Sequence, residues 1–265
     1  MPFRKAGEPK LRAELWNEMN IAKGVEALEL PMNVMGTQSI IHPTLIWDDE
    51  TVILVDAGIP SQLPEIRKVM DRVGAPFSKL NIVILTHQDL DHIGGLPDLL
   101  RSSDHKVEVL AHEAEKPYIQ GDKPLIKLNP ELMLKRLESL PEEQRKQMEK
   151  FLAESQKLKA NIDKTIEDGE ILPYCGGITV IFTPGHTPGH ICLYLNQSKT
   201  LITGDALNVI DGQLVGPKPE FTADIVAANK SLEKLVGYDI KTVICYHGGV
   251  YQENVNQRLL ELAKA

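Results

Sequence analysis

The stretch that most constrains this chain runs from residue 81 to residue 95 and reads N-I-V-I-L-T-H-Q-D-L-D-H-I-G-G. Its apolar run at 82–85 is short and rich in β-branched residues, which predicts a buried strand. Two histidines and two aspartates follow within six residues, and then a pair of glycines. Imidazole and carboxylate groups together suit zinc, iron or manganese. We therefore expect a strand that ends in a metal-binding loop.

Three further apolar runs end in the same way, with a histidine or an aspartate near glycine. The runs at 178–182, 200–203 and 242–245 lead to His186, Asp205 and His247. Glycine allows close backbone approach and positive φ around a small site. Core packing alone gives no reason for such residues at four strand ends, so we expect these side chains to converge on one site.

Composition narrows the class of partner. The formal net charge of −8 argues against a nucleic-acid surface, which would need a basic face. No apolar run approaches the ~20 residues of a membrane span, and no apolar stretch follows the first charged residues as in a signal peptide. Three scattered cysteines, Cys175, Cys192 and Cys245, predict buried thiols in a reducing compartment. We expect a cytoplasmic protein that acts on a small molecule and binds neither nucleic acid nor membrane.

The apolar pattern predicts a single domain over residues 20–265, with residues 1–19 as a disordered arm or an artificial extension. Strands are expected where apolar residues alternate or run together, and helices where they recur at helical spacing. The expected strands are 25–30, 39–47 with a break at Pro43, 51–55, 82–85, 106–111, 178–182, 191–195, 200–203 and 242–245. The expected helices are 61–73, 223–235 and 252–264.

Residues 113–168 interrupt this pattern. They are rich in lysine and glutamate, and they give no strand signal. Helix starts are predicted at 129–131 and 141–143, because proline is favoured in the first turn and acidic residues follow it. We expect a helical insertion that forms a lid or a substrate wall, or whose apolar face packs on the rest of the domain or on a second subunit, giving a homodimer.

The motifs together resemble those of the metallo-β-lactamase-fold hydrolases, whose signature is T-H-x-H-x-D-H followed by a distant His, Asp and His. This chain has T-H-Q-D-L-D-H at 86–92, followed by His186, Asp205 and His247. Order, spacing and strand context match from about Val25 to the C-terminus. The resemblance implies an α/β (α+β) fold, namely a four-layer αββα sandwich with the site at one edge, between the sheets.

The resemblance also implies two divalent metal ions that share one ligand, with zinc expected first and iron or manganese as alternatives. The implied ligands are His87, Asp89 and His186 for the first ion, Asp91, His92 and His247 for the second, and Asp205 as the bridge. Asp56 ends a predicted strand and is similar to a recurrent aspartate of the family. It is expected to orient a metal-bound histidine, although it could instead cap a turn.

Asp89 departs from the signature, which has histidine at this position. Asp91, Asp205 and a bridging hydroxide would cancel three of the four positive charges of two divalent ions, and Asp89 would cancel the last. Such an oxygen-rich site favours iron or manganese over zinc and is a weaker Lewis acid. Flavodiiron-type relatives carry a carboxylate at this position and use iron. Alternatively, Asp89 caps the helix that follows.

These observations predict a metal-dependent hydrolase of a small-molecule ester, thioester or lactone, which uses a metal-bridging hydroxide. The resemblance also implies that Asp91 is the catalytic proton carrier to the leaving group. Several lactonases of the fold carry tyrosine three residues after the bridging aspartate, and Asn208 stands there in this chain, which counts against a lactonase. The alternative is an iron-dependent redox or oxygen-handling protein of the same fold, and Asp89 is the residue that favours it.

Overall fold

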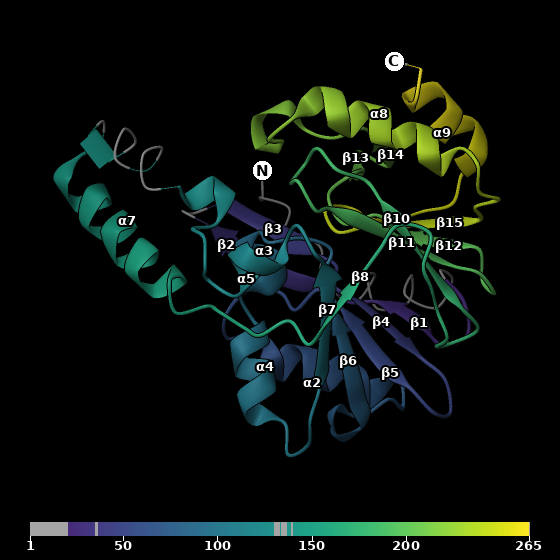
Figure 1. The fold of residues 1–265 in the computed structure, drawn as a ribbon, viewed down its shortest axis with the longest axis horizontal. Coiled ribbons are helices and arrows are strands. Elements are labelled where there is room, and N and C mark those ends of the chain that lie inside the picture. Colours follow the sequence, from purple (N-terminus) through teal and green to yellow (C-terminus); the bar gives the residue numbers. More distant parts are fainter. Residues whose placement is uncertain (1–20, 35–36, 130–132, 134–136, 139, 265) are drawn as a thin grey trace, which may run out of the picture.

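The computed structural model describes residues 21–264 apart from 35–36, 130–132, 134–136 and 139. Two six-stranded sheets face each other, and helices cover the outer side of each (Figure 1). The predicted α/β class and four-layer αββα sandwich are therefore confirmed. The predicted arm at 1–19 lies outside the described residues.

The first sheet comes from the first part of the chain together with one late strand. Its order is β1 (Val25–Ala27), β4 (Thr44–Trp47), β5 (Val52–Val55), β6 (Leu80–Ile84), β7 (Glu108–His112) and β8 (Lys164–Ile166). The strands from β5 to β8 are parallel, and α2 (Leu63–Arg72) and α4 (Leu96–Ser102) connect β5 to β6 and β6 to β7. Both helices lie on the outer side of this sheet (Figure 1).

The second sheet is built by the C-terminal part of the chain. Its order is β16 (Gly249–Tyr251), β15 (Thr242–Cys245), β12 (Thr200–Ile202), β11 (Ile191–Leu195), β10 (Ile178–Phe182) and β9 (Ile171–Leu172). Its outer side is covered by α8 (Ile225–Leu235) and α9 (Val255–Leu262), as Figure 1 shows. Two small hairpins complete the strands, β2 (Leu30–Val34) with β3 (Thr37–Ile41) and β13 (Asn208–Ile210) with β14 (Gln213–Val215).

Alternation along the strands divides the core into three layers. In β6, Ile82 and Ile84 point between the two sheets, whereas Val83 points toward the outer helices. In β15, Ile244 points between the sheets and Val243 packs under α8 and α9. Successive side chains of a strand face opposite sides, so apolar strands buried on both faces hold sheets and helices together.

The described part of the segment at 113–168 is mostly helical or irregular. Its described elements include α5 (Lys116–Ile119), the 3-10 turn η2 (Ile126–Leu128) and α7 (Glu142–Ser155), and α7 extends away from the sandwich (Figure 1). Two further 3-10 turns in the described residues are η1 (Phe77–Lys79) and η3 (Pro219–Phe221). No helix in the described part of the chain is long and apolar enough to cross a membrane.

Two details of the sequence prediction are wrong. The segment at 113–168 does contain a strand, because β8 pairs with β7, but three residues are too few for alternation to show. The expected strand at 25–30 ends at Ala27, and β2 begins at Leu30. The break expected at Pro43 is confirmed, because β3 ends at Ile41 and β4 begins at Thr44, and proline has no N–H for a ladder.

Gly95, directly before α4, offers a test of the packing beneath the metal-motif loop. A Cβ at Gly95 would lie 2.1 Å from the carbonyl oxygen of Ala57. We expect Gly95→Ala to lower the free energy of unfolding by about 1–3 kcal/mol, because backbone must move to relieve the overlap. Urea unfolding measures this. Gly237→Ala is the control, since its nearest atom is 3.7 Å away; equal effects of the two changes would contradict the explanation.

Candidate metal centre

The predicted site residues lie where strands of both sheets end. Asp56 directly follows β5. The loop after β6 contains His87 and leads into the short helix α3 (Leu90–Ile93). His186, Asp205 and His247 follow β10, β12 and β15 in the second sheet. Polar groups at these ends extend beyond the apolar core, at the edge where α/β sheets commonly bind ligands.

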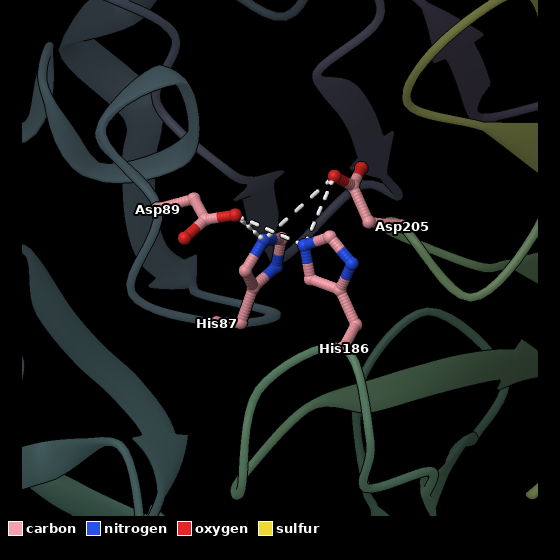
Figure 2. Close-up of side chains that lie close together, drawn as sticks. All are labelled: His87, Asp89, His186 and Asp205. Atoms are coloured by element: carbon pink, nitrogen blue, oxygen red, sulfur yellow. Dashed lines mark hydrogen bonds and ion pairs between the residues drawn. The ribbon is translucent and has the colours of Figure 1, made fainter. Parts of the chain in front are cut away.

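The first group of candidate ligands contains His87, Asp89, His186 and Asp205, which point toward one another (Figure 2). Asp89 Oδ2 lies 3.1 Å from His87 Nε2 and 2.9 Å from His186 Nε2. Asp205 Oδ2 lies 3.2 Å from His186 Nε2 and 4.0 Å from His87 Nε2. All four side chains are almost fully buried. Two imidazoles and two carboxylates thus face a common point.

The second group contains Asp91, His92 and His247. Asp91 Oδ2 lies 3.3 Å from His247 Nε2 and 3.9 Å from His92 Nε2. The other carboxylate oxygen of Asp205, Oδ1, lies 3.3 Å from His92 Nε2 and 3.4 Å from His247 Nε2. Asp205 therefore presents one oxygen to each group, as a bridging ligand must. The structure thus brings together all seven predicted ligands.

The donor atoms fit divalent metal ions. The ligand atoms of a tetrahedral ion with bonds of ~2.0–2.1 Å lie ~3.3 Å apart. Asp205 lies at about this separation from His186, at 3.2 Å, and from His247, at 3.4 Å, and Asp91 lies 3.3 Å from His247. The buried Nε2 atoms of His87 and His92 have no hydrogen-bond partner among the described residues. A buried nitrogen without a partner is unfavourable, and a metal ion would satisfy it.

Neighbouring charges set the pKa values of the groups. Burial, followed by the proximity of His92, lowers the pKa of His87 to about 4, so this imidazole is neutral. Burial alone would lower the pKa of His247, but the Asp205 and Asp91 carboxylates raise it to about 9. His92 likewise has a raised pKa because Asp56, Asp205 and Asp91 outweigh its burial. The negative charge that holds protons on these imidazoles would also attract metal cations.

Asp89 does not act as a helix cap. It occupies the N-cap position of α3, but its side chain makes no capping hydrogen bond. The carboxylate is directed toward His87 and His186 instead (Figure 2). Burial alone would raise the pKa of Asp89, but His87 and His186 hold it well below its usual range. The alternative that Asp89 merely caps the helix is therefore wrong, and its carboxylate is available to a metal.

Asp56 holds the loop that carries the histidines. Its Oδ1 accepts a hydrogen bond of 2.8 Å from the Thr86 N–H, and its Oδ2 accepts bonds of 2.8 Å from Thr86 Oγ1 and His92 Nδ1. Asp56 itself has φ of 62°, a left-handed conformation that brings its carboxylate to these donors. Since Nδ1 of His92 donates to Asp56, the lone pair of its Nε2 faces Asp205 and is free for a metal.

Two further residues support the loops of the site. His190 donates from Nδ1 to Thr183 and accepts at Nε2 from the Asp205 N–H, at 3.1 Å, so it fixes the loop of the bridging carboxylate. Tyr246 stacks on the His92 ring with centroids 3.7 Å apart, and its hydroxyl donates to the carbonyl oxygen of Asp91. A hydrogen bond to a distant backbone N–H, such as that of His190, has no signal in sequence.

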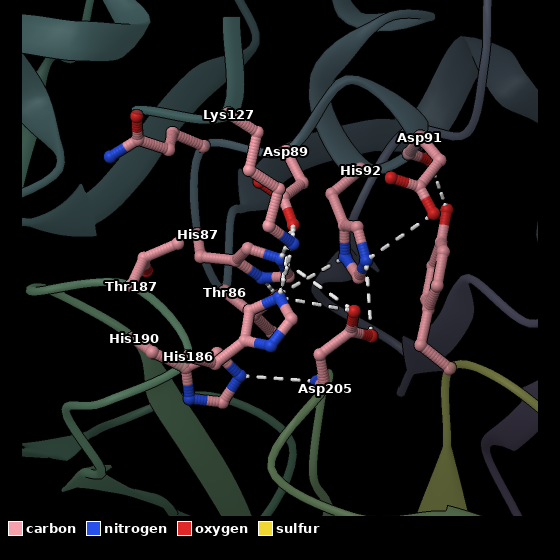
Figure 3. Close-up of polar contacts among 12 residues, drawn as sticks. Thr86, His87, Asp89, Asp91, His92, Lys127, His186, Thr187, His190 and Asp205 are labelled. Carbon is pink, nitrogen blue, oxygen red and sulfur yellow. Dashed lines mark hydrogen bonds and ion pairs between the residues drawn. The ribbon is translucent and has the colours of Figure 1, made fainter. Parts of the chain in front are cut away.

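Lys127 is a residue of the site that the sequence prediction missed. Its Nζ donates to Asp89 Oδ2 and lies 3.0 Å from His186 Nε2 (Figure 3). The one available signal was Asp89 itself, since a buried carboxylate in place of a neutral imidazole favours a cationic partner. Which of the lysines in the 113–168 segment fills that role depends on the path of the insertion, and periodicity does not specify that path.

Comparisons with known proteins agree with this geometry. Residues 36–247 match the family model of the "Metallo-beta-lactamase superfamily". The probable metallo-hydrolase YflN of Bacillus subtilis is 30% identical over 259 residues, 91% of this chain and 90% of that protein. Hydroxyacylglutathione hydrolase GloC of Haemophilus influenzae is 29% identical, over 62% of this chain and 65% of that protein. The structure of TTHA1429, a metallo-beta-lactamase family protein from Thermus thermophilus, superimposes with a TM-score of 0.69 at 22% identity and covers 92% of this chain and 79% of that one.

The fold and the converging histidines and aspartates define a metallo-hydrolase. The chain belongs to the metallo-beta-lactamase superfamily. The resemblance seen in the sequence is thereby confirmed, and so is the prediction that the protein is a metal-binding enzyme of the hydrolase class.

The contact of Asp56 with His92 generates a prediction. We expect Asp56→Asn to weaken metal binding by about 10–100-fold. The uncharged amide has only one acceptor oxygen for the three hydrogen bonds that the carboxylate accepts, so it no longer holds His92 in place. Metal content after dialysis against a chelator series measures the change. Asp239→Asn serves as the control, because Asp239 is largely exposed and pairs with Lys199. Unchanged metal retention in Asp56→Asn would refute the positioning role.

Proposed function

We propose that the chain binds two divalent ions and hydrolyses a small-molecule ester, thioester or lactone. The observation that carries this proposal is the carboxylate of Asp205. Its Oδ2 faces His186 and its Oδ1 faces His92 and His247, so a single side chain joins two donor groups. The proposed ligands are His87, Asp89, His186 and Asp205 for the first ion, and Asp91, His92, His247 and Asp205 for the second.

Bound metal ions would supply an acidified water as the nucleophile and would polarise the carbonyl group. The chain's own contribution is to orient and to move protons. Among the three site carboxylates Asp91 is the most exposed, with 24% of its side chain accessible against 8% for Asp89 and 10% for Asp205. It can therefore reach both the site and a leaving group, which suits a proton carrier.

The side chains of the site differ in their exposure to solvent. His87 and His92 are completely buried and His186 nearly so, whereas His247, Asp91 and Lys127 keep 24–34% of their side chains exposed. A substrate would approach over these three residues. The relative GloC is named a hydroxyacylglutathione hydrolase, which supports an acyl substrate. Asn208 has no hydroxyl that could replace that of the lactonase tyrosine. Its side-chain amide donates a hydrogen bond to the Gly216 carbonyl instead.

A substrate screen tests the proposed function. We expect metal-loaded protein to hydrolyse at least one member of a panel of aryl esters, acyl thioesters and lactones. Asp205→Ala should lose at least about 100-fold in kcat/KM and also retain less metal, because its carboxylate serves both donor groups. Asp239→Ala provides the matched control. Full metal loading of Asp205→Ala with unchanged turnover would reject the bridging assignment, and no hydrolysis by the parent would reject the substrate class.

Asp89 supports a second candidate, an iron-dependent redox or oxygen-handling protein of the same fold. Asp89 and Asp205 give the first group two carboxylates beside two imidazoles, and oxygen-rich donor sets favour iron and manganese relative to zinc. Two spectroscopically silent ions in the purified protein support hydrolysis, and a coloured, redox-active iron supports the alternative. The same analysis decides between zinc and iron.

We expect Asp89→His to shift metal preference toward zinc. The change replaces a hard oxygen ligand with an imidazole, which binds zinc well. Competition between zinc and manganese for the stripped protein, followed by elemental analysis, gives the preference directly. Asp98→His is a suitable control, because Asp98 pairs with Arg101 on the surface. If the zinc-to-manganese ratio of Asp89→His equals that of the parent, Asp89 is not a ligand.

A further inference from the structure

Lys127 reaches the same ligand atoms that the first metal ion would need. Its Nζ donates to Asp89 Oδ2 and lies 3.0 Å from His186 Nε2. These are the atoms that face each other at 2.9 Å in the first group. Figure 3 shows the lysine side chain extending into the space between them. One carboxylate oxygen and one imidazole lone pair cannot both accept hydrogen bonds from an ammonium group and coordinate a metal ion at full strength at the same time.

The backbone next to Lys127 is fixed by a residue of the metal motif itself. Gln88 lies between two candidate ligands in sequence, and its Oε1 accepts a hydrogen bond of 2.8 Å from the Ile126 N–H. Its Nε2 donates to Glu115 Oε2, also at 2.8 Å. Gln88 and Glu115 are both fully buried. The turn η2 that presents Lys127 is therefore attached directly to the metal-motif loop.

Glu115 extends this attachment to the loop of His186. Its Oε1 accepts hydrogen bonds from Thr187 Oγ1 at 2.8 Å and from the Gly189 N–H at 2.6 Å. One buried carboxylate thus joins the insertion to both loops that supply the ligands of the first group. The position of Lys127 is set by this buried hydrogen-bond network and not by a loose surface segment.

The charges of Asp89 and Lys127 offset each other. Asp89 adds a negative charge where the family signature has a neutral imidazole, and Lys127 adds a positive charge in contact with it. The second group differs, because no lysine or arginine forms an ion pair with Asp91 in the described part of the chain. Among the described residues, a lysine therefore forms an ion pair with a carboxylate of the first group but with none of the second group's own residues.

We propose that Lys127 is a tethered cation that competes with a divalent ion for Asp89 and His186, and so makes the first metal site the weaker of the two. This inference rests on the metal centre of the proposed function. The second site fills first, and an ion enters the first site only when the ammonium withdraws. Lys127 can do so because 34% of its side chain is already exposed and its stem is long and flexible.

Zinc titration of the stripped protein against a chromophoric chelator tests the proposal. We expect the parent to bind one zinc ion tightly and a second at least tenfold more weakly. Lys127→Met should strengthen the weaker site by tenfold or more, equivalent to ~1.4 kcal/mol. Lys123→Met is the matched control, since it removes the same charge from the same segment, and its Nζ lies 5.6 Å from the Tyr118 ring. This control should titrate as the parent does.

Two results would overturn the proposal. One is a parent that binds both zinc ions equally tightly, and the other is a Lys127→Met protein whose weaker site is unchanged or weaker still. Lys127→Gln repeats the measurement with a polar side chain, and circular dichroism establishes that each variant is folded. Titration does not measure turnover. A failed substrate screen therefore leaves the competition result standing, and an unchanged titration leaves the proposed hydrolysis standing.

Discussion

Burying several carboxylates within a few ångströms of one another is unfavourable unless positive charge lies among them. Asp89, Asp91 and Asp205 meet in this way at the junction of the two sheets, together with four imidazoles. The hydrogen bonds from the surrounding loops do not neutralise this charge. The protein supplies part of the compensation through Lys127 and through the raised pKa values of His92 and His247. The negative charge that is left uncompensated attracts metal cations to this centre.

The sandwich brings these groups together from distant parts of the chain. Strands of the first sheet deliver Asp56 and the loop at 86–92, and strands of the second deliver His186, Asp205 and His247. Neither sheet has a complete set of ligands. Because apolar side chains fill the space between the sheets, the relative position of the two halves is fixed by close packing, and so is the separation of the ligands.

The sequence predicted the parts of the structure that follow from local pattern. The apolar runs at 82–85 and 242–245 became β6 and β15 because alternation and β-branching act over a few residues. The convergence of polar groups emerged because packing does not explain histidine and aspartate at four strand ends, and the individual ligands were those that the family resemblance implied. Lys127, β8 and the contact of His190 with Asp205 did not emerge, since each depends on long-range proximity. The hydrogen bond from the Asp205 N–H to His190 and the pairing of β7 with β8 join segments that are distant in the sequence and meet only in the folded chain.

The hydrogen bonds of Gln88 have a consequence for exchanging segments between relatives. Gln88 occupies a variable position of the signature, yet its amide contacts the backbone of the insertion on one side and Glu115 on the other. A chimera that imports this insertion without Gln88 would lose the anchor of η2 and leave the Glu115 carboxylate under-satisfied. Loop, glutamine and glutamate therefore form one transplantable module, and protein engineers would have to move them as a unit.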